Sequence, residues 1–299
     1  MPEISSAHNH EHNERDSIFR TRLGAHELIV LSDGFANFNP DDVMIAGDET
    51  KKSLPTNSCC PVDVPINVFL LVMGQEIVLV DTGGGEIFKF DTAGRLLKSF
   101  NKSGYAPEQI TTILITHFHG DHTGGLTVGG KRLFPNAKVF ADMRESRHWL
   151  TPIGEDAYFQ HRTQSFRDAH TTVDPYVESG QLHEFDAAND DSDRILPGVR
   201  TRPLYGHTPG HCGYMIESQG ERILFWGDSV HFPDIQLFDP TISVTWDVDQ
   251  EMAKETRVKL FQDAASERFL IGAPHIGFPG LGYVDLEGNR YKWTAIEKD

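Results

Sequence analysis

Residues 116–125, with the sequence THFHGDHTGG, follow the apolar run ILI at positions 113–115. Within six residues they contain three histidines and an aspartate, namely His117, His119, Asp121 and His122. So dense a group of polar side chains is poorly suited to core packing, whereas imidazole and carboxylate groups are common metal ligands. The apolar run predicts a buried strand, so we expect a metal-binding loop at the end of that strand.

Further candidate ligands stand at the ends of later predicted strands. They are His207 after the strand at 199–204, Asp228 at the end of a hairpin at 214–228, and His275 at the end of the strand at 268–275. With the first loop they make seven candidate ligands, too many for one tetrahedral zinc ion and suited to two metal ions that share one ligand. The shared ligand should be a carboxylate, because its two oxygens can reach both ions, and Asp228 is the natural candidate.

Composition and charge limit the classes of partner. The 299 residues carry a formal charge of −17, which argues against nucleic acid or an anionic membrane as a partner. No apolar stretch approaches the roughly 20 residues of a membrane span. Three cysteines give no disulfide framework, and the polar N-terminus lacks the order of a signal peptide, so we expect a cytoplasmic protein.

The chain reads as one structured domain behind a polar tail. We expect residues 1–18, which include His8, His10 and His12, to be a disordered tail and residues 19–299 to form a single domain. The other expected elements are a strand at 26–34, a surface loop at 35–64, a hairpin at 66–81, a helix at 86–103, a strand at 138–141, helices at 154–170 and 249–265, and a loop at 277–290. The hairpins at 66–81 and 214–228 both end in aspartate, which suggests a pseudo-duplicated pair of sheets; coincidence is the alternative.

The order of these motifs resembles a known family. The pattern HxHxDH, the later GHTPGH, the Gly227-Asp228 pair and the strand-end His275 resemble the metallo-β-lactamase superfamily in order and spacing, from about residue 24 to the C-terminus. Four shorter segments, LSDG at 31–34, LVDTG at 79–83, GYAPEQ at 104–109 and APHIGFPG at 273–280, resemble its methyl parathion hydrolase branch. That branch stands beside lactonases and arylesterase-like enzymes.

The resemblance implies a fold and a ligand set. The fold is an α/β protein, an αββα sandwich with a dinuclear metal site at one edge between its two sheets. One metal ion would be held by His117, His119 and His207, the other by Asp121, His122 and His275, and Asp228 would bridge them. We expect both divalent ions to be zinc, although such ligands also accept manganese, iron or cobalt. A bridging hydroxide would attack the substrate, and Asp121 would carry a proton to the leaving group.

Residues around this site have weaker signals. Phe118 lies inside the ligand loop, and Trp149 follows an FPNA segment as a pocket tryptophan does in the similar branch, so both are candidate substrate contacts. We expect Asp81 to orient a ligating imidazole rather than bind metal. His211 has the same expected role, with packing in the core as its alternative. The substrate should be small, neutral and apolar, and a homodimer through the 35–64 loop is a further expectation from the resemblance.

The function expected from this combination is hydrolysis of a lactone or an aryl ester, with phosphotriester hydrolysis as a further activity. The alternative is an enzyme that acts mainly on organophosphate triesters. A β-lactamase is disfavoured by the lack of an export signal, and a flavodiiron protein by the lack of room for a flavin domain. A non-catalytic metal-binding protein is the remaining alternative, and the complete ligand set argues against it.

Overall fold

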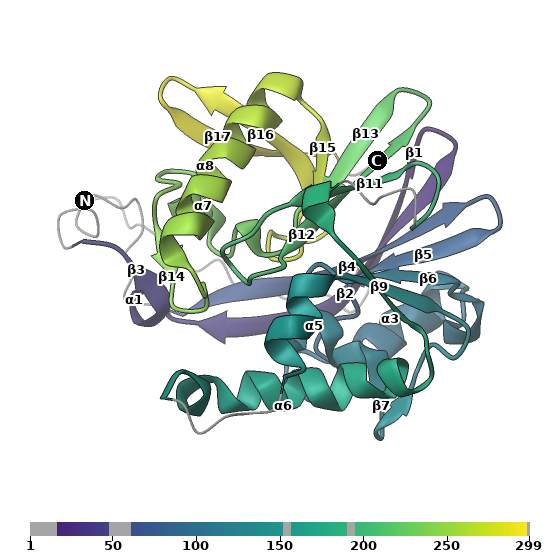
Figure 1. Cartoon of the computed structure of the whole chain (residues 1–299). Helices are drawn as coiled ribbons and strands as arrows, with labels where there is room; N and C mark the ends of the chain where they lie inside the picture. Colours follow the sequence, from purple (N-terminus) through teal and green to yellow (C-terminus); the bar gives the residue numbers. More distant parts are fainter. Residues whose placement is uncertain (1–16, 48–60, 152–156, 190–194, 298–299) are drawn as a thin grey trace, which may run out of the picture.

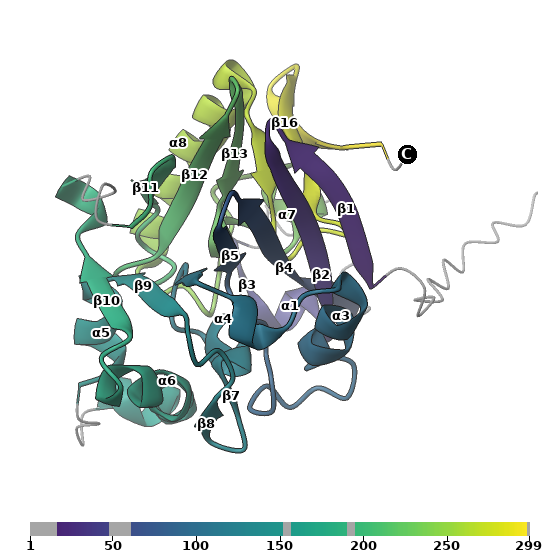
Figure 2. The ribbon, with the colours of Figure 1, turned by 90° about the vertical axis from the view of Figure 1, so that its right-hand side faces the viewer.

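The computed structural model describes residues 17–47, 61–151, 157–189 and 195–297, without the side chains of residues 157–162. Two β-sheets face each other, and helices cover the outer face of each sheet (Figures 1 and 2). This confirms the predicted αββα sandwich. Most of the predicted tail, and with it His8, His10 and His12, lies outside the described residues, and the first strand begins at Ile18.

Within the part of the chain that the structure describes, the first sheet has seven strands. In spatial order they are β1 (Ile18–Leu23), β2 (His26–Phe38), β4 (Val62–Met73), β5 (Glu76–Val80), β6 (Thr112–Leu114), β9 (Lys138–Asp142) and β10 (Leu182–Phe185). Successive side chains of a strand point to opposite faces. Leu28 and Val30 therefore face the second sheet, whereas Ile29 and Leu31 face the helices, and all four are fully buried.

Helices α3 (Leu96–Ser103), α5 (Met143–Trp149) and α6 (Ala157–Glu178) cover the outer face of this sheet. Figure 1 shows α5 and α6 on this side of the molecule, opposite α8. Short elements connect the larger ones: α1 (Pro40–Val43), β3 (Met44–Ile45), α4 (Gly120–Thr123), β7 (Thr127–Val128), β8 (Lys131–Arg132), α7 (Pro233–Gln236) and β14 (Ser243–Val244).

The second sheet has six strands among the described residues. In spatial order they are β11 (Val199–Pro203), β12 (Cys212–Ser218), β13 (Glu221–Phe225), β15 (Leu270–Gly272), β16 (Leu281–Glu287) and β17 (Arg290–Ala295). Helix α8 (Gln250–Glu267) packs Leu260 and Phe261 against its outer face. No helix among the described residues is long and apolar enough to cross a membrane.

The two sheets share a local plan, as the paired hairpins predicted. In each, a hairpin (β4–β5 or β12–β13) is followed by a strand parallel to its second strand (β6 or β15). The residue before His117 accepts a hydrogen bond from Cys212 N–H at 3.0 Å, and the residue before His275 accepts one from Asn67 N–H at 2.9 Å. Each of these strand ends is thus tied to the opposite sheet, which brings the predicted ligands to one edge of the sandwich.

Two predicted loops are strands over part of their length. β2 continues to Phe38 and β4 starts at Val62, so the ladder between them enters both ends of the predicted 35–64 loop; residues 48–60 lie outside the described part. Burial of Ala36 and Val64 outweighs the weak strand signal of this segment. Likewise, β16 and β17 occupy most of the predicted 277–290 loop, where Leu281 and Val284 are buried.

The helix boundaries also differ from the prediction. Only Leu96–Ser103 of the predicted 86–103 helix is helical, because the Asp33 carboxylate accepts backbone hydrogen bonds from Gly84, Gly94 and Leu96 and holds residues 84–95 in turns. Helix α6 runs past the predicted end at residue 170 and through Pro175, because Val173 and Tyr176 on either side of the proline are both buried in the core.

Candidate metal centre

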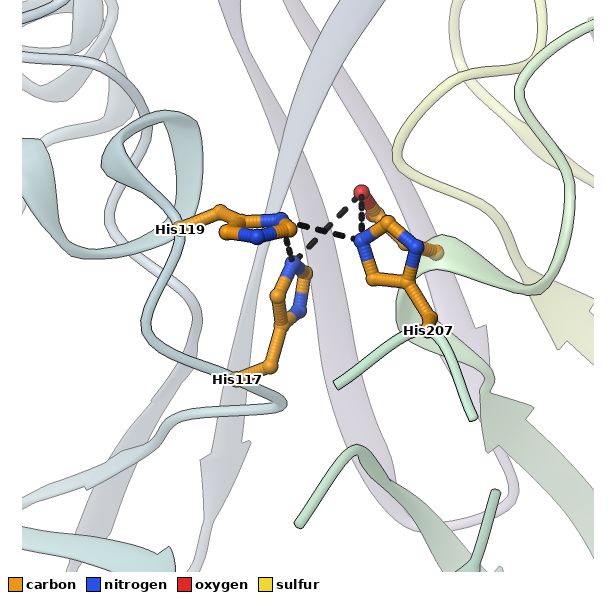
Figure 3. Close-up of side chains that lie close together, drawn as sticks. His117, His119 and His207 are labelled. Atoms are coloured by element: carbon orange, nitrogen blue, oxygen red, sulfur yellow. Dashed lines mark hydrogen bonds and ion pairs between the residues drawn. The ribbon is translucent and has the colours of Figure 1, made fainter. Parts of the chain in front are cut away.

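Three histidines converge from two different loops. His117 and His119 follow β6, whereas His207 follows β11 of the other sheet. Nδ1 of His119 lies 3.1 Å from Nε2 of His117 and 3.0 Å from Nε2 of His207 (Figure 3). The three imidazole rings thus present these nitrogens to one point. Together with a carboxylate oxygen of Asp228, the three nitrogens form the first candidate metal group.

A second group lies beside the first. It consists of Asp121, His122, Asp228 and His275, with ligand atoms within 4.8 Å of one another. Asp121 Oδ2 lies 3.8 Å from His122 Nε2 and 3.6 Å from His275 Nε2. The structure therefore brings together all seven residues that the sequence predicted as ligands.

Asp228 belongs to both groups, and its two oxygens divide between them. Oδ2 lies 3.2 Å from His207 Nε2 and 3.5 Å from His117 Nε2. Oδ1 lies 2.8 Å from His122 Nε2 and 3.0 Å from His275 Nε2. This is the arrangement expected of a carboxylate that serves two metal ions at once.

Buried polar atoms in the second group fit a cation. Among the described residues, His122 Nε2, His275 Nε2 and Asp228 Oδ1 are buried, and the hydrogen bonds of the structure give them no partner outside this group. Buried polar atoms that face only one another call for an explanation such as an ion between them. Imidazole and carboxylate donors at this spacing suit zinc and similar divalent ions, so the residues fit the metals that the sequence predicted.

The groups behind the ligands fix the orientation of the rings. Asp81 Oδ2 lies 2.8 Å from Nδ1 of His122, Asp247 Oδ1 lies 2.8 Å from Nδ1 of His207, and the carbonyl oxygen of Pro65 lies 2.8 Å from Nδ1 of His275. Each acceptor favours the tautomer that leaves Nε2 free for a metal ion. Asp81 therefore lies where an orienting carboxylate should lie. Asp247, which the sequence analysis missed, has the same relation to His207.

His211 connects two parts of the backbone. Its Nδ1 donates to the carbonyl oxygen of Leu204 at 2.8 Å, and its Nε2 accepts from the backbone N–H of Asp228 at 3.0 Å. Gly227 has a φ of 53°, and a Cβ there would meet His211 Nε2 at 2.3 Å, so only glycine allows this approach. Burial lowers the pKa of His211 to about 3, and nearby His207 adds to the effect.

Charge in the centre is concentrated on Asp228. Burial opposes its ionisation, but the facing imidazoles of His122, His275 and His117 outweigh burial and hold its pKa well below the usual range. Burial lowers the pKa of His207, yet its hydrogen bonds to Asp228 and Asp247 raise that pKa to about 9. An ionised carboxylate that faces several imidazole nitrogens is a charge arrangement that suits divalent cations.

A cavity of about 480 Å³ opens onto both groups. Its floor contains His119, Asp121, Asp228 and His275, and its apolar wall contains Phe38, Val64, Phe88 and Trp246. The wall is continuous: the rings of Phe38 and Trp246 lie 4.8 Å apart, and Phe90 bridges Phe38 and Phe88 at 5.3 and 4.9 Å. The cavity therefore joins an apolar surface to a polar floor, as small-molecule sites usually do.

Comparison with known proteins identifies the family. The sequence-family model of the metallo-beta-lactamase superfamily matches residues 61–272, which are well over half of the chain. The chain belongs to the metallo-β-lactamase superfamily. The sequence resemblance is thereby confirmed at the level of the superfamily.

Solved structures of this superfamily resemble the whole domain. The crystal structure of hydrolase AbOPH in the beta lactamase superfamily is 28% identical, with a TM-score of 0.85 over 95% of this chain and 99% of AbOPH. The structure of AidC, a dizinc quorum-quenching lactonase, is 26% identical, with a TM-score of 0.81 over 95% of this chain and 99% of AidC.

Curated relatives match a smaller part of the chain. An atrochrysone carboxyl ACP thioesterase from Passalora fulva is 26% identical over 167 residues, which cover 55% of this chain and 38% of the thioesterase. The chain thus matches well under half the length of this relative.

The two residues predicted to touch substrate do not line the cavity of this superfamily member. Phe118 and Trp149 are both fully buried in the core between the first sheet and its helices. The side chain of Phe118 points away from the cavity wall although its neighbours in the chain are ligands. Trp149 lies edge-on to His119, with ring centroids 5.3 Å apart, and donates from Nε1 to Glu145. The structure corrects the prediction, because these side chains support the metal loop from the core and not from the cavity.

His231 is a residue of the centre that the sequence analysis missed. Its Nε2 lies 2.9 Å from Asp228 Oδ2, and its ring stacks on that of His275 at 5.3 Å. It lines the cavity, and burial lowers its pKa. The spacing Asp228-x-x-His231 carried no strand-end signal, because His231 follows a turn rather than an apolar run. Its position became evident only from the fold.

Proposed function

We propose that this protein is a metal-dependent hydrolase that opens lactones or cleaves aryl esters of small, neutral, apolar substrates. The observation that supports this most strongly is the division of the Asp228 oxygens between two groups of histidines. Similarity to the lactonase AidC over nearly the whole domain supports the choice of lactone. An N-acyl homoserine lactonase from a Bacillus species, 23% identical over 52% of this chain, agrees with it.

The ligand assignment follows from the two groups. His117, His119 and His207 would hold one ion, Asp121, His122 and His275 the other, and Asp228 both. When bound, two divalent ions lower the pKa of water toward neutrality and polarise the oxygen of the attacked group. Zinc is the ion we propose, because four His/Asp donors in each group suit it and AidC is described as a dizinc enzyme.

Asp121 is the residue we assign to proton transfer. It lies on the cavity floor, and its Oδ2 faces His275 Nε2 at 3.6 Å. Opening a lactone produces an alkoxide that must be protonated, and the Asp121 oxygen that does not bind metal could take a proton from the attacking water and pass it to that alkoxide. A nitrophenolate leaves without this help, so the proton transfer that we assign to Asp121 is needed for lactones and not for nitrophenyl esters.

The cavity wall sets the class of substrate. Phe38, Phe88 and Trp246 offer aromatic surface to an apolar body. Asp168 adds a carboxylate to the lining of the same cavity, and the chain has a net charge of −17, so an anionic substrate would be repelled. Both features favour a neutral substrate with an apolar part.

A substrate panel tests this proposal. Zinc-loaded protein is assayed with an N-acyl homoserine lactone, dihydrocoumarin, a nitrophenyl ester and paraoxon, and kcat/KM is compared. We expect the lactones or the aryl ester to exceed paraoxon by at least tenfold. Asp228→Ala should lose metal and all hydrolysis together, whereas Asp234→Ala, the same change at an exposed position on α7, should keep both.

Two outcomes of these experiments would contradict the proposal. Efficient turnover of paraoxon with no turnover of lactones or aryl esters would make the protein primarily a phosphotriester hydrolase. Full activity of Asp228→Ala with one metal ion would remove the bridging role on which the ligand assignment depends.

A further inference from the structure

Glu145 is a fully buried carboxylate beneath the metal centre. It lies on α5 and accepts four hydrogen bonds. Oε2 accepts from the backbone N–H of Phe118 at 2.9 Å and from Trp149 Nε1–H at 2.9 Å. Oε1 accepts from Thr208 Oγ1–H at 2.6 Å and from the backbone N–H of Gly210 at 2.7 Å. Burying a charge is costly unless it is fully hydrogen-bonded, and this one is.

Two of the four donors are adjacent in the chain to ligands of the first group, and a third, Gly210, lies in the loop that carries His207. Phe118 stands between His117 and His119, and Thr208 directly follows His207. The first loop follows a strand of the first sheet and the second follows a strand of the other sheet, so Glu145 ties the two loops to one carboxyl group. The approach is close, because a Cβ on Gly210 would lie 2.7 Å from the backbone nitrogen of Glu145.

The second group is held by other means. Asp81 contacts His122, and the carbonyl oxygen of Pro65 contacts His275. The four donors that contact Glu145 are not adjacent in the chain to Asp121, His122 or His275. A defect at Glu145 should therefore act on one metal position more than on the other.

The chemistry of the four contacts requires a carboxylate. All four partners are donors, so each oxygen of Glu145 must accept twice. A glutamine of the same shape would place its NH2 group against at least one N–H donor whichever way the amide is turned, since only the hydroxyl of Thr208 can also accept. Substitution by glutamine thus breaks at least one contact while it leaves the packing volume almost unchanged.

We propose that Glu145 is a positioning residue that sets the separation of His117 and His119 from His207, and so selects the geometry of the first metal position. It acts through the backbone of the two loops and touches neither substrate nor metal. The inference rests on the ligand set proposed above. It extends that set by naming a residue that supports the first metal position and not the second.

The test measures metal binding rather than activity. Metal-free wild type and Glu145→Gln are titrated with Co²⁺, whose visible spectrum reports ligand geometry, and with Zn²⁺ in competition with a chelator. We expect the wild type to bind two ions tightly. Glu145→Gln should keep one tight ion with the spectrum of the second group and bind the other at least tenfold more weakly.

Two further variants separate positioning from general destabilisation. Tyr176→Phe removes a buried hydroxyl that bonds Leu126 and Phe134 in the same helical layer, and it should bind both ions as the wild type does. Thr208→Val removes a single contact to Glu145 Oε1, so it should show a smaller loss confined to the same metal position. This variant carries the test if Glu145→Gln does not fold.

The possible failures are distinguishable. Two tight ions with wild-type spectra in Glu145→Gln, or in Thr208→Val if the first variant is unfolded, would overturn the role of Glu145 and leave the ligand set intact. Equal weakening of both ions would also overturn it, because the inference requires a selective effect. A wild type that binds fewer than two ions would instead overturn the ligand set itself.

Discussion

At the scale of single residues, the centre depends on side chains that hold other side chains. Three ligand imidazoles turn Nδ1 toward an oxygen of another segment: His122 toward Asp81, His207 toward Asp247 and His275 toward Pro65. Asp247 is itself anchored, because its Oδ2 accepts from Ser243 Oγ at 2.6 Å and lies 3.6 Å from buried Arg257.

Asp247→Asn should weaken metal binding at the first position. The amide can present an oxygen either to His207 or to Ser243 and Val244, but not to both sides, so the ring of His207 loses its fixed orientation. Loss of such an orienting group typically costs 10–100-fold in metal affinity. Chelator competition with Zn²⁺ measures the effect. An unchanged affinity for both ions would show that Asp247 serves the packing of Arg257 rather than the metal.

The sequence could reveal the seven ligands and the supporting residue Asp81, but not the supporting residues Asp247 and Glu145. His117, His207 and His275 stand after apolar strand runs, where a polar residue is conspicuous. Asp247 and Glu145 do not follow an apolar run. The contact of Asp247 with His207 and that of Glu145 with Thr208 join residues 40 and 63 positions apart in the chain. Phe118 and Trp149 show the converse: proximity in sequence to ligands did not determine which way their side chains point.

At the scale of elements, the segment between β5 and α3 depends on one buried carboxylate. Asp33 accepts backbone hydrogen bonds from Gly84 at 2.8 Å, Gly94 at 3.2 Å and Leu96 at 2.7 Å. The apolar spacing of residues 86–103 predicted one helix. Such spacing takes no account of a side chain more than 50 residues away that holds the backbone in turns. The segment matters for function, since it carries Phe88 to the cavity wall.

Asp33→Asn should loosen this segment. Its amide nitrogen would face at least one backbone N–H, and a buried donor left unsatisfied costs about 1–3 kcal/mol. We expect the free energy of unfolding in urea to fall by about that amount. KM for an apolar lactone should rise more than kcat falls, because Phe88 is displaced and the ligands are not. A lower kcat at unchanged KM would contradict this account of the segment.

At the scale of the whole molecule, the centre is shared between two similar halves. Asp81 and Asp228 follow the second strands of equivalent hairpins, and His117 and His275 follow the strands parallel to them. In the first half, Asp81 contacts the candidate ligand His122. In the second half, Asp228 belongs to both candidate metal groups. The paired hairpins in the sequence predicted the duplication, but the different roles of the two aspartates depend on contacts between the halves.

Because ligands from both halves surround each candidate position, activity should depend on filling both. The most direct measurement is the rate of dihydrocoumarin opening by metal-free protein as Zn²⁺ is added in known equivalents. We predict no hydrolysis without metal and a rate that rises to a plateau at two equivalents per chain. Full activity at one equivalent, or no hydrolysis of any lactone or ester at two, would contradict a dinuclear hydrolase.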